Sequence, residues 1–172
     1  ADLDAITTEY ARKRLALARI DAELSSKPFQ PDVQAPVALL HETGAQYQAN
    51  RDALAAALAE ERSRLVKAQQ ELAAARQQKE RLEAVLPHYR EQDRAYEKLV
   101  KDGFAGALMG SDKRRERIEK EQELATQGHL IASAQASIDQ SQKKLKQIEA
   151  DYVRQLHAER NEAQAQIDKL SK

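Results

Sequence analysis

The sequence predicts an all-α protein: a long antiparallel two-helix coiled-coil hairpin with an additional short N-terminal helix. Three observations indicate this fold class. The chain is rich in Ala, Leu, Glu, Gln, Lys and Arg, which favour helices, and only 4% of its residues are aromatic. Apolar residues recur at alternating spacings of three and four along most of the chain. Proline and glycine gather in two short stretches that divide the helix-forming sequence into three segments.

Residues 1–26 are predicted to form the short amphipathic helix. The helix should end before Pro28, because the residue preceding a proline avoids the α region. A proline-containing loop at residues 27–36 follows. Six of the seven positions on one helix face are apolar; the face consists of Leu3, Ile6, Tyr10, Lys13, Leu17, Ile20 and Leu24.

Residues 37–101 are predicted to form the first arm of the hairpin. Pro87 lies inside the arm, where it removes a backbone donor, so we expect a kink there with the helix continuing beyond it. Eleven of fourteen heptad positions are apolar; the seam consists of Leu54, Leu58, Glu61, Leu65, Ala68, Leu72, Ala75, Lys79, Leu82, Leu86, Tyr89, Asp93, Tyr96 and Val100.

The third segment is predicted to be helical from about residue 111, where Ser111 or Asp112 can cap it, to residue 172. Its apolar seam includes Leu124, Ile131, Ile138, Leu145 and Tyr152. The two arms have matching lengths around an apex near Phe104. Residues 37–172 are therefore expected to form an antiparallel coiled-coil hairpin with its tip at 102–111 and arms of about 100 Å.

The placement of residues 1–26 has two solutions. This helix could continue the line of the second segment, or it could pack beside the base of the hairpin. We prefer packing, because an apolar stripe is costly to expose. The helical pattern runs through both ends of the sequence, so we interpret the chain as a fragment of a larger protein.

Several function classes fit the composition poorly. The 28 basic and 28 acidic residues balance, which argues against nucleic-acid binding. The absence of cysteine excludes a thiol nucleophile, a disulfide and a Cys-based zinc site. No two of the four histidines share a helical turn, so no helix-face metal pair is expected. We therefore expect no catalytic site, metal or cofactor, and predict that the chain is not an enzyme.

The apex combines glycine with large apolar residues. Three of the five glycines lie within residues 103–110, and Phe104, Leu108 and Met109 stand among them. One interpretation is a structural turn in which an apolar residue plugs the end of the coiled coil. The other is a docking tip, because apolar residues at the end of an arm have no core to reach. The run at 113–115 is either a solvated cationic stretch or a contact for acidic groups on a docking partner.

Residues 96–106, Tyr-Glu-Lys-Leu-Val-Lys-Asp-Gly-Phe-Ala-Gly, resemble the tip of periplasmic adaptor proteins, also called membrane fusion proteins. The family's tip motif is an Arg, a Leu four residues later and a Ser seven residues after that. Leu99 matches the Leu, whereas Ala95 takes the Arg position, with Arg90 and Arg94 nearby. Gly106 takes the Ser position, where its small size would let the helix ends approach closely.

The order of short helix, proline-containing loop and long hairpin resembles the HlyD-like adaptors of type I secretion. This resemblance implies a periplasmic segment of a protein anchored in the inner membrane of a Gram-negative bacterium. It also implies a flanking lipoyl-like domain, assembly as a hexamer around an ABC transporter, and docking of the tip to a TolC-like outer-membrane channel. The alternatives are a generic structural coiled-coil rod and a drug-efflux adaptor hairpin. The implied docking residues are Arg94, Ala95, Leu99, Gly103, Phe104, Gly106, Leu108 and Met109.

Overall fold

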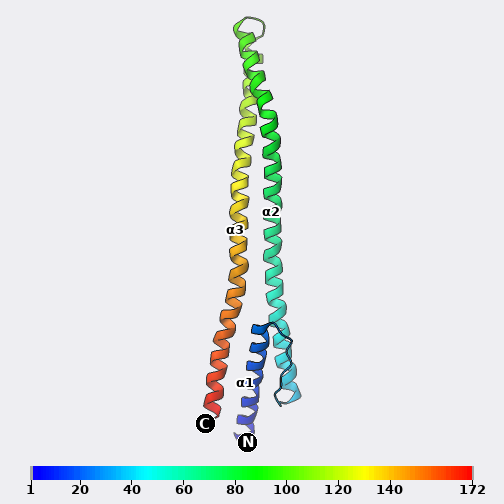
Figure 1. Ribbon diagram of the computed structural model, residues 1–172, viewed down its shortest axis with the longest axis vertical. Coiled ribbons are helices and arrows are strands. Elements are labelled where there is room, and N and C mark those ends of the chain that lie inside the picture. Colours follow the sequence, from blue (N-terminus) through cyan, green and yellow to red (C-terminus); the bar gives the residue numbers. More distant parts are fainter. Residues whose placement is uncertain (1, 172) are drawn as a thin grey trace. The chain divides into compact units, whose positions relative to one another are not determined.

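The computed structural model describes residues 2–171 and contains three helices, α1 (Asp2–Ser25), α2 (Val37–Lys101) and α3 (Ala107–Leu170). The two long helices are antiparallel and form a hairpin, with α1 as the additional short helix (Figure 1). No strand occurs among the described residues. The predicted fold class is therefore confirmed. Within residues 2–171, no helix has both the length and the apolar character needed to cross a membrane.

The chain divides into two compact units. The first unit comprises Ala1–Arg62 with Lys143–Lys172, and the second comprises Ser63–Gln142. The first unit thus holds α1, the beginning of α2 and the end of α3. The second unit holds the rest of the two long helices and the turn that joins them.

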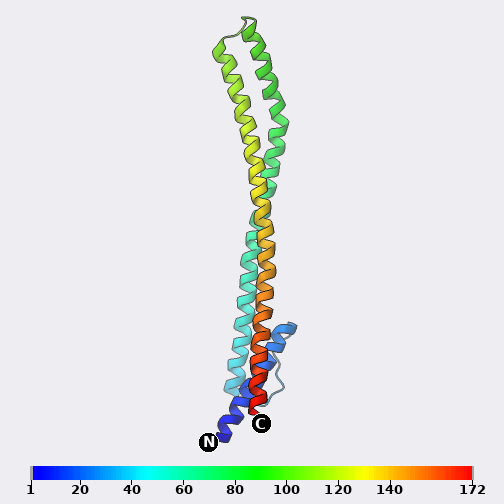
Figure 2. The ribbon, with the colours of Figure 1, turned by 90° about the vertical axis from the view of Figure 1, so that its left-hand side faces the viewer.

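In the second unit, α2 and α3 run antiparallel and are joined by the turn (Figure 2). Apolar residues of the two helices pack together between them. All predicted seam positions of α2 in this unit are buried or half-buried, except Lys79, which is exposed. The helix continues through Pro87 as predicted. Next to it, Leu82 and Leu86 are only 1% and 3% exposed. A core cluster farther from the turn consists of Ala68, Leu72, Ala134 and Ile138, with Leu65 and Ile131 packed against it.

In the first unit, α1 packs beside α2 and α3, which confirms the arrangement we preferred. Tyr152 Oη on α3 donates to Glu23 Oε1 on α1 at 2.6 Å, and Asn50 Nδ2 on α2 donates to Glu23 Oε2 at 3.4 Å. Arg19 donates to Glu159 Oε2 at 2.9 Å and also bonds Glu23. Burial of Arg19 and Glu23 is tolerated because each has charged or polar partners.

The predicted apolar face of α1 is only partly correct. Leu3 and Ile6 belong to that face, yet they are 75% and 47% exposed. Leu15 lies outside it and is completely buried. The reason is that α1 contacts two helices rather than one, so its buried arc is wider than a single coiled-coil seam. The buried residues of α1 are Leu15, Arg19, Ile20, Ala22 and Glu23.

The loop after α1 packs against the first turns of α2. At the end of α1, Lys27 N donates to Ala22 O at 3.0 Å, and Ser26 adopts a positive φ of 56°. Tyr47 Oη then donates to Lys27 O at 2.7 Å. The rings of Phe29 and Tyr47 stack with their centroids 5.9 Å apart.

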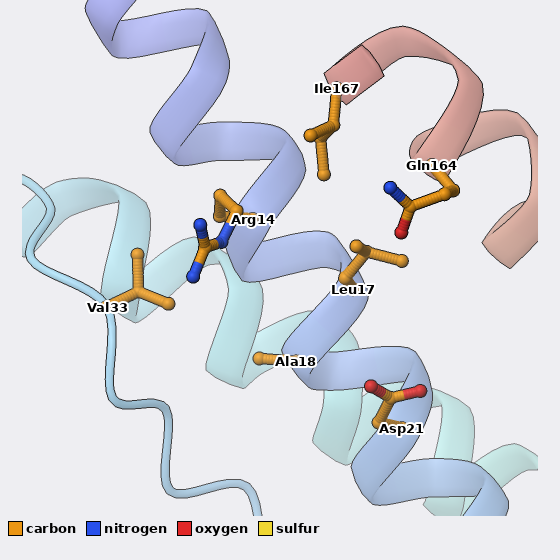
Figure 3. Close-up of a pocket in the computed structure, with 7 residues that line it drawn as sticks. All are labelled: Arg14, Leu17, Ala18, Asp21, Val33, Gln164 and Ile167. Carbon is orange, nitrogen blue, oxygen red and sulfur yellow. The ribbon is translucent and has the colours of Figure 1, made fainter. Parts of the chain in front are cut away.

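A recess of about 360 Å³ lies between α1, the loop and α3 (Figure 3). Leu17 and Ile167 supply part of its apolar lining. Its two charged lining residues already have partners: Arg14 bonds the hydroxyl of Tyr10, and Asp21 Oδ1 lies 3.2 Å from Arg160 Nε. The charge of Asp21 is thus paired, whereas the guanidinium of Arg14 contacts the neutral hydroxyl and the ring of Tyr10.

The start of α3 differs from the prediction. The helix begins at Ala107, so Ser111 and Asp112 lie inside it and do not cap it. Gly110 N instead donates to Gly106 O at 3.3 Å. Glycine is acceptable directly before a helix, which is why the turn is shorter than the glycine content suggested.

Candidate functional site

The turn between α2 and α3 begins with a Schellman motif. Phe104 N donates to Leu99 O at 2.8 Å, and Gly103 N donates to Val100 O at 3.2 Å. Gly103 has a φ of +80°, a conformation that residues with a Cβ rarely adopt. The glycine therefore lets α2 end abruptly and the chain reverse.

Large apolar side chains around the turn are exposed. Phe104 is 82% exposed and Leu108 is 79% exposed, while Met109 and Leu99 are 47% and 39% exposed. Phe104 therefore does not plug the end of the hairpin. Several exposed apolar residues at one place are typical of an interaction site.

Near the turn, α3 comes close to α2 at Gly110. A Cβ placed on Gly110 would lie 2.8 Å from Val100 Cγ2, closer than real Cβ contacts allow. By contrast, a Cβ on Gly106 would meet no atom within 4 Å. The expectation that Gly106 permits the close approach is therefore wrong, because the helices touch one turn later along α3.

Pairs of side chains link α2 and α3 over the turns next to this contact. Lys113 Nζ lies 5.3 Å from the centroid of the Tyr96 ring, a cation–π distance. Arg117 Nε donates to Asp93 Oδ2 at 2.6 Å. These partners are consistent with a single antiparallel register. Moving from Tyr96 to Asp93 along α2 corresponds to moving from Lys113 to Arg117 along α3.

Arg117 is also the centre of a small ionic network. Its Nη1 lies 3.1 Å from both carboxylate oxygens of Glu121, and Arg90 Nε lies 3.3 Å from Glu121 Oε1. Hydrogen bonds to Asp93 and Glu121 raise the pKa of Arg117 above its ordinary value. The hydrogen bond from Arg117, with a further one from Arg90, lowers the pKa of Glu121. Both shifts favour the charged forms of Arg117 and Glu121.

The cationic run at 113–115 is divided among different partners. Lys113 pairs with Glu116 at 3.7 Å in addition to its contact with Tyr96. Arg115 lies 3.5 Å from Asp112 and 3.7 Å from Glu119. These pairs within α3 favour the interpretation of this run as a mostly solvated stretch.

The structure gathers the predicted docking residues around the turn, and all eight are exposed. Arg94, Ala95 and Leu99 lie on the last turns of α2, and Leu108 and Met109 on the first turn of α3. Sequence reasoning missed the contact between Gly110 and Val100. The one available signal was the third glycine of the stretch, but its neighbour follows only from the register.

The comparisons with known proteins concern the whole chain. Residues 1–172 match the family model described as AprE, long alpha-helical hairpin. No curated protein sequence matches the chain. Among solved structures, the chain is similar to the soluble domain of LipC, a membrane fusion protein of a type I secretion system. The TM-score is 0.83 at 16% identity, over 99% of this chain and 68% of that chain.

These two findings agree on one architecture. At 16% identity, the likeness to LipC shows a shared fold, and the family match extends over every residue of this chain. The resemblance to membrane fusion proteins of type I secretion, noted from the tip and the helix order, is thereby confirmed. The chain belongs to the AprE family of long alpha-helical hairpins.

Proposed function

We propose that this chain is the periplasmic adaptor segment of a type I secretion system. In this proposal it bridges an ABC transporter in the inner membrane and a TolC-like channel in the outer membrane, and the hairpin tip docks the channel. The observation that carries the proposal is the exposure of Phe104 and Leu108 at the turn, 82% and 79%. Membership of the AprE family of long alpha-helical hairpins supports it, as does the likeness to the soluble domain of LipC, a membrane fusion protein of a type I secretion system.

The proposed role requires binding and spacing rather than catalysis. The 65 residues of α2 provide a contour of about 100 Å at the usual rise of an α-helix. Burial of a large apolar side chain such as Phe104 contributes about 1.5–3 kcal/mol, so a few such residues suffice for a reversible contact. Each hairpin would act as one member of a hexamer and reach the transporter through regions outside this chain.

The proposal assigns a role to each of three parts of the sequence. Residues 1–26 and the loop at 27–36 hold the two ends of the hairpin together, and residues 37–172 carry the tip to the channel. The docking residues are those predicted from the sequence, with Phe104 and Leu108 as the principal apolar contacts. The hydrogen bonds between α1 and α3 support the holding role.

The test uses the full-length adaptor in cells that contain its transporter and channel. A photo-reactive amino acid at position 104 or 108 should cross-link to the outer-membrane channel. Phe104→Ser and Leu108→Ser should each lower secretion by about tenfold at unchanged adaptor abundance. The matched control is Leu130→Ser, because Leu130 is also an exposed leucine of α3 (49%) but lies away from the turn.

The opposite pattern would refute the proposal. If positions 104 and 108 cross-link only to inner-membrane proteins, the tip does not face the channel. If the Leu130 variant loses as much secretion as the two tip variants, the turn has no special role in docking.

A further inference from the structure

The part of the hairpin next to the turn has no buried core. Within the described residues, none from Pro87 to Ser133 is buried, whereas the core cluster of the second unit lies farther from the turn. Leu86, which is 3% exposed, is the last buried residue of α2 before the turn. We call residues 88–122 the tip-proximal segment, which is green to yellow-green in Figure 2. The two helices of this segment therefore need other contacts to hold them together.

Cations of α3 face aromatic rings and a carboxylate of α2 along the tip-proximal segment. Three such pairs follow one another: Tyr89 with Lys120 at 5.6 Å, Asp93 with Arg117 at 2.6 Å, and Tyr96 with Lys113 at 5.3 Å, where the two longer distances run from Nζ to the ring centroid. Their members on α2 occupy seam positions at which mostly leucine and alanine stand farther from the turn. Polar pairs thus replace apolar contacts at the seam itself.

These pairs hold the helices less firmly than a buried apolar core does. The side chains of Arg117 and Asp93 are 26% and 13% exposed, and the neighbouring pair of Arg90 and Glu121 is more exposed still. Water competes for ion pairs that solvent reaches, and salt screens them. Cation–π contacts are also weak where they are solvated. Separating the helices in this segment therefore needs less free energy than separating them around Leu72.

Each helix has a weakened turn where the tip-proximal segment meets the core. Pro87 has no N–H, so it cannot donate to the carbonyl of Glu83 in the preceding turn of α2. Gly128 lies inside α3, between the tip-proximal segment and Ala134 of the core cluster. A Cβ on Gly128 would meet no atom within 4 Å, so packing does not require this glycine, yet glycine weakens a helix interior. Motion of the segment is therefore poorly transmitted to the core.

We propose that the tip-proximal segment opens as a separate unit, in which its paired side chains part while the core around Leu72 stays closed, and that ionic strength controls how often it opens. Opening changes the spacing of the two helices next to the turn without unfolding the rest of the hairpin. The inference goes beyond the proposed function and does not depend on it, because the contacts that carry it lie within the second unit and involve no partner.

Amide hydrogen exchange of the full-length adaptor tests the opening, since a helix that has lost its partner is marginal in water and exchanges. Relative to their intrinsic rates, peptides of residues 88–100 and 112–122 should exchange at least about tenfold faster than peptides around Leu72 and Ile138. Between about 0.1 M and about 1 M NaCl, the screening length falls from about 10 Å to about 3 Å. Exchange in the tip-proximal segment should then rise a further threefold or so, while exchange around Leu72 stays the same.

The role of the polar pairs is tested by replacing the middle pair with leucines. The double variant Asp93→Leu/Arg117→Leu should slow exchange in the tip-proximal segment by about tenfold and remove most of its salt dependence, because two facing leucines extend the apolar core. The matched control is Lys79→Leu, which also places leucine at a charged seam position but on the core side of Pro87. It should leave exchange in the segment within about twofold of the wild type.

The weakened turns are tested with Pro87→Ala and Gly128→Ala. Alanine restores the missing donor in α2 and stabilises the interior of α3, and at Gly128 it has room for its methyl group. Together the two substitutions should slow exchange in the tip-proximal segment by about threefold or more, because both helices then resist opening. Melting temperatures of all variants check that the fold is retained.

Three outcomes would overturn the proposal. The first is equal protection of residues 88–100 and of peptides around Leu72. The second is fast exchange in the segment that neither salt nor the leucine pair alters. The third is protection that declines gradually from Leu86 to the turn with no step at Pro87, since that pattern indicates fraying from the turn. None of these outcomes bears on the proposed function, which is decided by cross-linking at positions 104 and 108.

Discussion

Two residues with positive φ end helices in the same way but carry different side chains. Ser26 ends α1 with φ 56°, and Gly103 ends α2 with φ 80°. Both donate through the backbone N–H in a Schellman pattern. Glycine adopts this conformation without strain, whereas a residue with a Cβ does so at a cost of roughly 1 kcal/mol.

Exchanging these two residue types should therefore change stability in opposite directions. We expect Ser26→Gly to raise the free energy of unfolding by about 0.5–1 kcal/mol and Gly103→Ser to lower it by about 1 kcal/mol. Urea denaturation followed by circular dichroism measures both. A destabilised Ser26→Gly variant would mean that the side chain of Ser26 makes a contribution that outweighs the backbone strain.

Tyr152 makes stability depend on alkaline pH. Burial, together with the hydrogen bond to Glu23, raises the pKa of Tyr152 to about 12, against a weaker opposing effect of Arg51. Because the folded state holds the proton more tightly, this contribution is complete below about pH 10. It is lost as pH rises from about 10 to about 12.

The variant Tyr152→Phe should lack this dependence. At pH 7 we expect it to be less stable than the wild type by about 1–2 kcal/mol, because Glu23 loses a hydrogen bond. The difference should shrink between pH 10 and pH 12, as measured by urea denaturation at a series of pH values. A difference that stays constant across that range would show that Tyr152 does not ionise with unfolding.

At the scale of elements, α1 shows how a second partner changes which residues are buried. Leu15 is completely buried although it lies off the predicted stripe, and Leu3 is 75% exposed although it lies on it. We expect Leu15→Ala to cost about 2–5 kcal/mol, through lost apolar contacts and a cavity. Leu3→Ala, the same chemical change at an exposed position of the same helix, should stay within about 0.5 kcal/mol.

Urea denaturation of the two variants measures the contrast. Similar midpoints for both variants would show that α1 does not need its packing against the hairpin for stability. In that case the hydrogen bonds of Arg19 and Glu23 to the other helices, rather than apolar packing, would hold α1 in place.

Whether the sequence predicts the buried face or the first residue of a helix depends on which contacts determine that feature. The seam of α2 in the second unit was predictable because heptad spacing selects one face whenever a helix has one partner. The buried residues of α1 were not predictable in the same way, because α1 contacts two helices. The spacing of apolar residues does not show where the second of these helices lies. The start of α3 was misplaced because glycine is compatible with a turn, a cap and a helix interior.

The candidate site was predictable in composition but not in geometry. Exposure of Phe104 and Leu108 follows from their position beside a reversal, where no core exists. The close contact at Gly110 does not follow from the sequence, because it depends on Val100 of the other helix lying opposite the glycine. Register links the two helices, and register emerges from the seam as a whole rather than from the residues at the tip.

At the scale of the whole molecule, the two units differ in how many helices share a core. The first unit packs three helices and buries Leu15, Ile20 and Glu23 almost completely. The second packs two helices along a single seam, and most residues of both helices in this unit are exposed. Local opening needs less free energy where fewer buried contacts must be broken.

We therefore expect amide hydrogen exchange to be faster in the second unit than in the first. The comparison is sharpest between peptides around Leu72, in the core of the second unit, and peptides around Ile20 and Leu156, in the first. Mass spectrometry of deuterated peptides at neutral pH measures it. Leu15→Ala should then raise exchange around Ile20 and Leu156 and leave the peptides around Leu72 unchanged, because the cavity weakens only the three-helix core. Equal acceleration throughout the chain would show that the two units unfold as one cooperative body.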